Sequence, residues 1–152
     1  MGGGAKWSLA PTTALLSHLG NPQHQFSAVH VAGTNGKGSV VTFVARVLER
    51  AGCRVGSYTS PHLVDLRERV VVNGVPISES AFAAWTTRLQ PEIERVEASF
   101  FEAYTAIAFA DFAARGVELA VVETGLGGRL DSTNVLQPIV SAITQIGMDH
   151  AE

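Results

Sequence analysis

The sequence predicts an α/β fold: a mostly parallel sheet of the phosphate-loop (P-loop) type, with helices on both faces. Short apolar runs typical of strands alternate with segments of helical periodicity, which favours parallel strands joined by helices. A glycine-rich stretch containing a lysine stands between the first such strand and the helix after it. Polar residues follow several further predicted strands. With 152 residues, 46% of them hydrophobic, the chain is long enough for one domain with its own core.

Composition excludes several classes of partner and compartment. The formal net charge is −3 and the basic residues are scattered among acids, so we expect no nucleic-acid partner. The chain has a single cysteine, Cys53, which excludes an intrachain disulfide and favours a reducing cytoplasm. No apolar stretch reaches the roughly 20 residues of a bilayer span, so we expect no membrane segment.

Local signals bound the elements of the first half. Thr12 or Thr13 is predicted to cap a short helix that ends at Gly20. The β-branched run 27–32 predicts a strand, and apolar residues at helical spacing predict a helix from Ser39 to a stop at Gly52. A second strand is expected at 53–58. The Asn-Gly pair within 69–78, flanked by apolar runs, predicts a β-hairpin.

The second half continues the alternation. Ser78 is predicted to cap a helix reaching Arg95, with Pro91 expected to kink or divide it. A further helix is expected at 99–116 and a strand buried on both faces at 117–123. The glycine-rich segment 124–134 predicts a loop, and 139–147 a last buried strand.

The first candidate site is "GTNGKGS", residues 33–39, between a strand and a helix. Its backbone N–H groups can wrap phosphate oxygens, Lys37 can reach the β and γ phosphates, and the helix directs its positive end at the anion. The predicted nucleotide-binding residues are Gly33, Thr34, Asn35, Gly36, Lys37, Gly38 and Ser39. The usual loop has Ser or Thr directly after its lysine to bind Mg²⁺, whereas Gly38 stands there. A metal therefore needs oxygen ligands from elsewhere.

Residues at other strand ends are the candidates. Ligands gather at the carboxyl ends of parallel strands, so the glycine loop, the "TSPHL" segment, Glu123 and the Asp149-His150 pair are expected at one edge of the sheet. Glu123 ends an apolar strand, where nucleotide enzymes place a metal-binding carboxylate. A surface acid and a hydrogen-bonded structural histidine are the alternatives for Glu123 and His150.

A third segment, "FFEAY", could form an aromatic shelf for a flat ring, with Glu102 as its polar contact. Aromatic residues at helical spacing are more often part of a core, so the segment alone predicts no ligand.

Taken together, the motifs resemble a known family. "HVAGTNGKGSV", "YTSPHLVDLRERVVVNG", "SFFEAYTAIAF", "VVETGLGGRLDSTN" and "ITQIGMDHAE" are similar to the amino-terminal ATPase domain of folylpolyglutamate synthases and bifunctional dihydrofolate synthases, within the Mur-type ligases. The resemblance covers nearly the whole chain in order. It implies that residues 1–152 form the amino-terminal part of the Mur ligase central, ATP-binding domain, and that a carboxy-terminal glutamate-ligase domain lies outside them.

The resemblance also implies a site and a reaction. Ser60 would supply the missing metal oxygen, together with Glu123 and His150, and Lys37 would be catalytic. The pteroate pocket would be lined by Leu9, Phe101, Glu102, Tyr104 and Leu130, although Leu9 alone matches the usual motif around it. With ATP and Mg²⁺, such an acid–amino-acid ligase adds L-glutamate to a folate or to dihydropteroate through an acyl phosphate. We expect a monomer when full length.

Other readings remain open from the sequence. A GTPase would want an N-K-x-D motif, which is absent, and a kinase would not need "SPHL" or "GLGGRLD". A cell-wall or cyanophycin-type ligase is closer, and would be separated by substrate trials. A stretch that binds nucleotide without catalysing a reaction is the non-enzymatic alternative.

Overall fold

A six-stranded sheet forms the centre of the computed structural model, which describes residues 8–147. The strand order across the sheet is β4-β3-β2-β5-β1-β6. The strands are β1 (Ser27–Ala32), β2 (Val55–Tyr58), β3 (Val70–Val72), β4 (Val75–Pro76), β5 (Leu119–Glu123) and β6 (Val140–Ile143). β2, β5, β1 and β6 pair in parallel, whereas β3 and β4 add an antiparallel hairpin at one edge.

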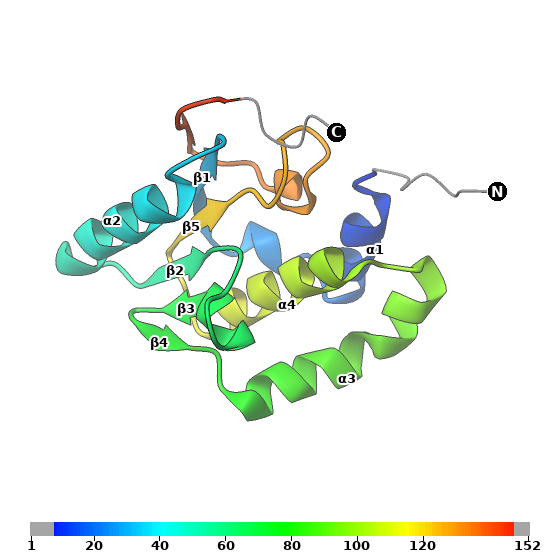
Figure 1. Cartoon of the computed structure of the whole chain (residues 1–152). Coiled ribbons are helices and arrows are strands. Elements are labelled where there is room, and N and C mark those ends of the chain that lie inside the picture. The colour runs from blue at the N-terminus through cyan, green and yellow to red at the C-terminus, as the bar shows by residue number, and fades with distance from the viewer. Residues whose placement is uncertain (1–7, 148–152) are drawn as a thin grey trace.

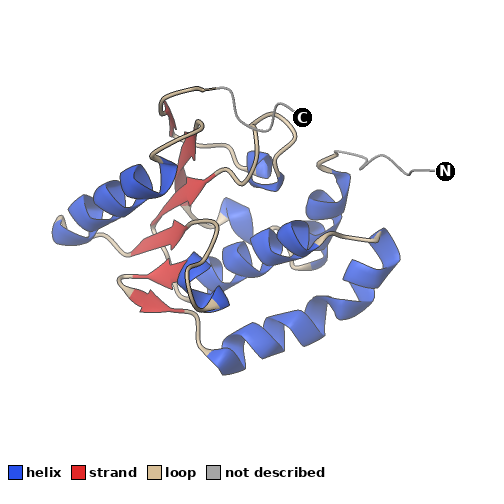
Figure 2. Ribbon diagram, viewed as in Figure 1, coloured by secondary structure: helices blue, strands red, loops and turns tan. Residues whose placement is uncertain are grey.

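Helices cover both faces of this sheet, as the sequence predicts (Figures 1 and 2). The helix after the glycine loop, α2, lies on one face, and the other three α-helices lie on the opposite face. The helices are α1 (Ala10–His18), α2 (Lys37–Arg50), α3 (Glu79–Val96) and α4 (Phe100–Ala114), with 3₁₀ turns η1 (Pro22–His24), η2 (Leu66–Arg69) and η3 (Ser132–Val135). No helix between residues 8 and 147 combines the length and apolar character of a membrane span.

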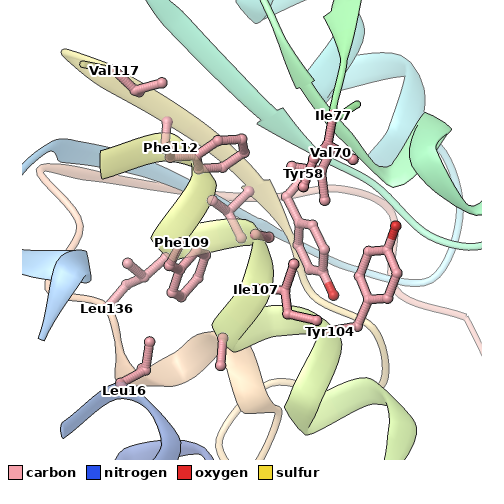
Figure 3. Packing of buried hydrophobic residues seen from close by; sticks show 14 of the residues in the cluster. Leu16, Tyr58, Val70, Ile77, Tyr104, Ile107, Phe109, Phe112, Val117 and Leu136 are labelled. Carbon is pink, nitrogen blue, oxygen red and sulfur yellow. The ribbon is translucent and has the colours of Figure 1, made fainter. Parts of the chain in front are cut away.

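Two apolar clusters hold these layers together. On the α2 side, Val41 and Ala45 pack against Val121 of β5 and its neighbours. On the other side α4 is central, with every residue from Tyr104 to Phe112 buried. Figure 3 shows its aromatic side chains among residues from the strands and from α1. Successive residues of β5 alternate between the clusters, so the predicted burial on both faces is confirmed.

Several predicted boundaries are confirmed by specific contacts. The Ser78 hydroxyl accepts a hydrogen bond from the N–H of Ala81 at 3.1 Å and caps α3. Asn73 and Gly74 have φ angles of 46° and 77° in the turn between β3 and β4. These positive values are those that the predicted Asn-Gly hairpin requires.

Two local predictions are wrong, and one of the two outcomes expected for Pro91 is excluded. The first helix begins at Ala10 with Leu9 as its N-cap, because Pro11 favours the first turn, and Thr12 is buried within it. Pro91 does not divide α3, since it lies exposed on a helix anchored by Leu89 nearby. The last strand is not buried: β6 lies at the edge of the described sheet, pairs with β1 alone and leaves Ile143 70% exposed.

Candidate nucleotide and metal site

The carboxyl ends of three neighbouring strands form the site. Val31 of β1 lies opposite Glu123 of β5, and Tyr58 of β2 lies opposite Val122, so these strands end at nearly the same level. The segments that follow them are the glycine loop, the loop beginning at Thr59 and the glycine-rich loop 124–131. Three of the four features predicted at one edge are therefore together; Asp149 and His150 lie outside the described residues.

Glycine shapes the loop after β1. Gly33 has a φ of +127°, and a Cβ there would lie 3.0 Å from the backbone N of Thr144. Gly36 has a φ of +84° and is the N-cap of α2, whose first turn receives no side-chain cap. The first N–H groups of a helix have no partner within it, so those of Lys37, Gly38 and Ser39 can bind an anion.

The side chain of Lys37 lies between this loop and β5. Its Nζ donates a hydrogen bond to the carbonyl of Thr34 at 3.2 Å and lies 3.9 Å from Oε1 of Glu123. The Thr34 hydroxyl is engaged with the backbone of Gly147, and the Thr34 N–H donates to the carbonyl of Gln145 at 2.9 Å. The segment after β6 thus supports the loop from one side and Glu123 faces it from the other.

Glu123 joins the loops after β2 and β1. Its Oε2 accepts a hydrogen bond from the N–H of Ser60 at 3.1 Å, and its side chain is only 6% exposed. Burial raises the pKa of the Glu123 carboxyl, while the Ser60 N–H and the charge of Lys37 oppose that rise. A buried carboxylate with a single distant cation has oxygen free for a hard metal ion, so the residues present fit Mg²⁺.

The geometry at Gly38 bears on the hydroxyl that the usual phosphate loop carries. A Cβ built at Gly38 would lie 3.5 Å from Oε2 of Glu123. A serine or threonine in this position would therefore extend into the space beside that carboxylate. The backbone N–H of Ser60, after β2, contacts the same carboxylate, so a second strand end lies beside the region that the absent side chain leaves open.

The predicted metal set of Ser60, Glu123 and His150 is only partly visible. Ser60 and Glu123 are in contact, whereas His150 lies outside the described residues. Between residues 8 and 147, no cluster of three or more histidine, cysteine, aspartate or glutamate side chains is placed to hold a metal. The metal assignment stays a prediction.

The loop after β5 is fixed by Asp131 and Phe101. Oδ2 of Asp131 accepts hydrogen bonds from the N–H groups of Gly125 and Leu126, each at 2.8 Å. The ring of Phe101 packs directly on Gly125, where a Cβ would lie 2.8 Å from its Cε1 atom. Leu130, in the same loop, is 41% exposed.

The other predicted pteroate residues have different surroundings. Tyr104 is buried in the core at 1% exposure and its hydroxyl bonds the carbonyl of Leu66, so it is not a surface of a pocket in this structure. Glu102 accepts the N–H of Ser99 at 2.6 Å in a capping box at the start of α4. Leu9 begins α1, and both α1 and α4 contact η3 beside the loop of Leu130.

Three residues near the site were missed from the sequence. Glu68 binds the backbone after Ser60, Asp131 binds the backbone after Glu123, and His30 lies 2.7 Å from the Thr133 hydroxyl that donates to Asp131. The spacing Asp65-x-x-Glu68 and the Asp131-Ser-Thr run are typical of capping and Asx turns, and could have indicated the two acids. Nothing in the sequence pattern distinguishes His30 from any other strand residue.

No family model matches the chain. The chain is 44% identical over 154 aligned positions to the dihydrofolate synthase/folylpolyglutamate synthase of Bacillus subtilis, covering 97% of this chain and 36% of that protein. The folylpolyglutamate synthase of Thermotoga maritima has a TM-score of 0.89 at 44% identity, covering 93% of this chain and 35% of that one.

The chain belongs to the folylpolyglutamate synthase/dihydrofolate synthase family. A third relative of the family, the Mycobacterium tuberculosis folylpolyglutamate synthase solved with ADP and AMPPCP, has a TM-score of 0.91 at 40% identity, over 95% of this chain and 35% of that one. The chain spans about a third of the length of these relatives.

Proposed function

We propose that this chain forms the nucleotide-binding part of an ATP- and Mg²⁺-dependent ligase. The ligase would add L-glutamate to a folate, to dihydropteroate, or to both, through an acyl phosphate. The names of the relatives, folylpolyglutamate synthase and dihydrofolate synthase, supply the reaction and its substrates. Residues 1–152 would be the amino-terminal part of the ATP-binding domain, and the glutamate-ligase domain would lie in sequence beyond them.

One observation carries the proposal. Glu123, at the end of β5, lies at ion-pair distance from Lys37 at the start of α2 and accepts a hydrogen bond from the N–H of Ser60 after β2, so it joins three strand ends. A cation, a carboxylate and an uncapped helix N-terminus at the carboxyl edge of a parallel sheet suit a triphosphate with its metal. The relative from M. tuberculosis, solved with ADP and AMPPCP, supports a nucleotide in this place.

In this reaction the chain would position the phosphates of ATP and neutralise their charge. The substrate carboxylate attacks the γ-phosphorus of ATP, ADP leaves, and the acyl phosphate forms; the amino group of glutamate then attacks the acyl carbon and inorganic phosphate leaves. The N–H groups of residues 37–39 would fix the phosphates. Lys37 would turn from the Thr34 carbonyl to the phosphate oxygens, offsetting the charge that develops during transfer.

Glu123 and Ser60 would hold the magnesium ion, with His150 as the third expected ligand. Mg²⁺, when bound, would offset negative charge between the β and γ phosphates. Glu123 is fixed for this purpose by the Ser60 N–H, and its burial keeps competing water away. The neighbouring Gly38 leaves room for the ion beside the phosphates.

The acid substrate would lie by the loop after β5. Phe101 and Leu130 present apolar surface there, and Leu9 begins the helix that contacts the adjoining turn. Tyr104 and Glu102 would act indirectly, through the packing and the capping of α4. The enzyme would act on small molecules in the cytoplasm, as a monomer and without a nucleic-acid partner.

Calorimetry and an activity assay test this function. The full-length protein is titrated with ATP, with ATP and Mg²⁺, and with GTP and Mg²⁺ as a control. Incorporation of labelled glutamate is then measured with dihydropteroate, with a reduced folate and with a cell-wall precursor. We expect Mg²⁺-dependent ATP binding and incorporation with one or both pteridine acids.

Two outcomes would contradict the proposal in different ways. Incorporation with the cell-wall precursor alone would leave the nucleotide site standing and replace the substrate. Absence of ATP binding in the presence of Mg²⁺ would remove the nucleotide site itself.

A further inference from the structure

The loop between β2 and η2 carries Ser60 into the site without any glycine to shape it. Residues 60–65 read Ser-Pro-His-Leu-Val-Asp, and no strand or helix includes them. Only the first residue is tied to the sheet, through the Ser60 N–H and Glu123. The conformation of the rest must therefore come from contacts outside the sheet, and these are with η2.

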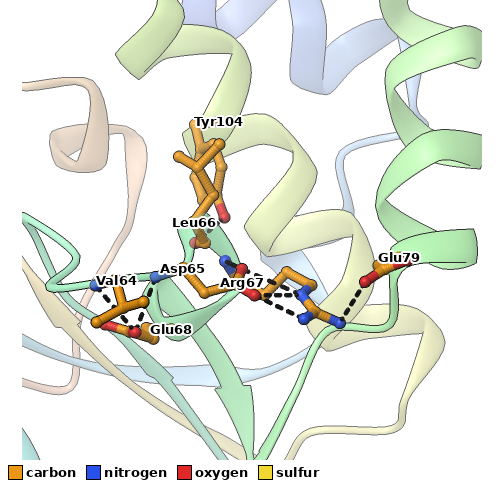
Figure 4. Close-up of polar contacts among 7 residues, drawn as sticks. All are labelled: Val64, Asp65, Leu66, Arg67, Glu68, Glu79 and Tyr104. Carbon is orange, nitrogen blue, oxygen red and sulfur yellow. Dashed lines mark hydrogen bonds and ion pairs between the residues drawn. The ribbon is translucent and has the colours of Figure 1, made fainter.

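Glu68 supplies three of those contacts. Its Oε2 accepts the N–H of Leu63 at 2.8 Å, and its Oε1 accepts the N–H groups of Val64 at 3.2 Å and Asp65 at 2.9 Å. Figure 4 shows the carboxylate facing the backbone of this turn. The bond to the Leu63 N–H, with those to Asp65 and Val64, lowers the pKa of Glu68, so the carboxylate stays charged at neutral pH.

The turn that Glu68 holds is otherwise unfavourable. Leu63 is 92% exposed and Val64 is 89% exposed, so two apolar side chains stand in solvent beside the site. Exposed apolar side chains favour collapse onto neighbouring apolar surface. A single carboxylate that satisfies three successive N–H groups opposes that collapse, because each bond would be lost if the turn folded over.

Other side chains bind His62 and Asp65 on the two sides of the turn, whereas the backbone between them is bound by Glu68. Arg69 donates from Nε to Nδ1 of His62 at 3.0 Å and lies over the ring of Tyr104 at 5.6 Å. Asp65 accepts from the Arg67 guanidinium at 2.6 Å, and Arg67 also pairs with Glu79 at 3.3 Å (Figure 4). The N–H groups of Leu63 and Val64 have Glu68 as their acceptor.

We infer that Glu68 is a positioning residue for the metal side of the site. By binding the N–H groups of residues 63–65 it sets the path of the loop, and thereby keeps Ser60 beside Glu123. This inference rests on the proposed function for its metal, but the ordering of the loop by Glu68 does not. A Glu68 that merely capped η2 would affect stability and leave metal binding unchanged.

Two variants and one control test the inference in the full-length protein. Glu68→Gln keeps the length of the side chain but has one acceptor oxygen, and Glu68→Asp keeps the charge but is one methylene too short. Glu79→Gln is the control, because Glu79 also lies on this surface and contacts Arg67 rather than the turn. Hydrogen exchange of the amides of residues 63–65 is measured first, and the Mg²⁺ concentration that half-saturates ATP binding second.

We expect amide exchange at residues 63–65 to become about tenfold faster in both Glu68 variants. We also expect the half-saturating Mg²⁺ concentration to rise about tenfold, with the melting temperature nearly unchanged. The Glu79→Gln control should match the unmodified protein in both measurements. Activity is not needed for either readout.

Each remaining outcome decides the inference. Unchanged amide exchange would overturn the ordering of the loop by Glu68, whatever the nucleotide does. Faster exchange with an unchanged Mg²⁺ requirement, or a lower melting temperature alone, would overturn the link to Ser60. If the unmodified protein itself shows no Mg²⁺-dependent binding, the proposed function fails, and the exchange data still decide the role of Glu68 in the loop.

Discussion

The loops after β1 and β2 meet at one site but are built in different ways. The loop after β1 takes its shape from glycine torsions, with φ values of +127° at Gly33 and +84° at Gly36. The loop after β2 has no glycine from Ser60 to Arg69 and is held by charged side chains, chiefly Glu68. The first leads into the uncapped N–H groups of residues 37–39, which can bind a ligand, whereas the second uses the N–H groups of residues 63–65 internally.

This difference separates two tasks. A backbone that must wrap an anion cannot also be satisfied by a local carboxylate, so glycine has to set its shape. A backbone that must present one side chain in a fixed place gains from being saturated with hydrogen bonds. The loop after β5 is likewise held by a carboxylate, because Asp131 accepts hydrogen bonds from the N–H groups of Gly125 and Leu126.

The largest effect is expected from removing the cation of the first loop. Lys37→Ala should lower the turnover of the full-length ligase about 1,000-fold, since charge on the transferred phosphoryl group would lose its partner. The free energy of unfolding should change by about 1 kcal/mol or less, because Lys37 makes one hydrogen bond and a 3.9 Å ion pair. Glutamate incorporation and chemical denaturation measure the two quantities. Arg46→Ala, on the exposed side of the same helix, is the control, and near-normal turnover of Lys37→Ala would refute the assignment.

The variant Gly33→Ala tests whether glycine shapes the loop after β1. The new methyl group would meet Thr144 at a φ of +127°, so we expect the free energy of unfolding to fall by about 3 kcal/mol or more. Gly36→Ala is the matched control, since its Cβ meets no atom within 4 Å and adds only the cost of a positive φ. Urea denaturation compares the two variants. Equal losses would mean that torsion alone, and not the close approach of Thr144 after β6, shapes the loop.

A smaller effect is expected in the second loop. Ser60→Ala should raise the Mg²⁺ concentration needed for half-maximal activity about tenfold, because one neutral oxygen ligand is lost while Glu123 keeps its N–H partner. A Mg²⁺ titration of activity at saturating ATP measures this, with Ser57→Ala in β2 as the control. An unchanged titration would count against Ser60 as a ligand.

The smallest effect concerns the support of the third loop and its pH dependence. Burial lowers the pKa of His30 below its ordinary 6.5, against the opposing charge of Asp131, so the folded protein keeps this imidazole neutral to lower pH than the unfolded chain does. The unfolded state therefore binds more protons, and stability falls as the pH drops through about 6.5. His30→Gln keeps a donor for Thr133 and should reduce that slope by less than about 1 kcal/mol between about pH 7 and about pH 6. A pH dependence of stability in His30→Gln equal to that of the unmodified protein would contradict the assignment.

Much of the fold was predictable because its signals are local. The strand at Ser27–Ala32, the Asn73-Gly74 hairpin and the Ser78 cap depend on residues close together in sequence. The failures concern context. Whether Pro91 breaks a helix depends on the surfaces that anchor the flanking turns, and whether Ile143 is buried depends on what lies beside the sheet, so neither follows from a window of sequence.

The residues of the site also divide into those that local sequence predicts and those that depend on tertiary structure. Lys37 and its glycines form a motif in one stretch, and Glu123 follows from the position of a strand end. The hydrogen bonds between Glu68 and the turn at Leu63 depend on a backbone conformation, which the periodicity of the sequence does not predict. The packing of Phe101 on Gly125 joins two elements far apart in sequence, so the pattern of aromatic residues showed that a helix was there without showing what its first turn supports.

The gap at Gly38 has a further consequence for which form of nucleotide is accepted. Because Gly38 has no side chain, the phosphates of a bare triphosphate would lie close to the buried carboxylate of Glu123 as well as to Lys37, and like charges in a shielded place repel strongly. A divalent cation bound to the triphosphate would turn this electrostatic repulsion from Glu123 into attraction. The edge of the sheet would then discriminate between ATP with its cation and ATP without it, through repulsion as much as through attraction.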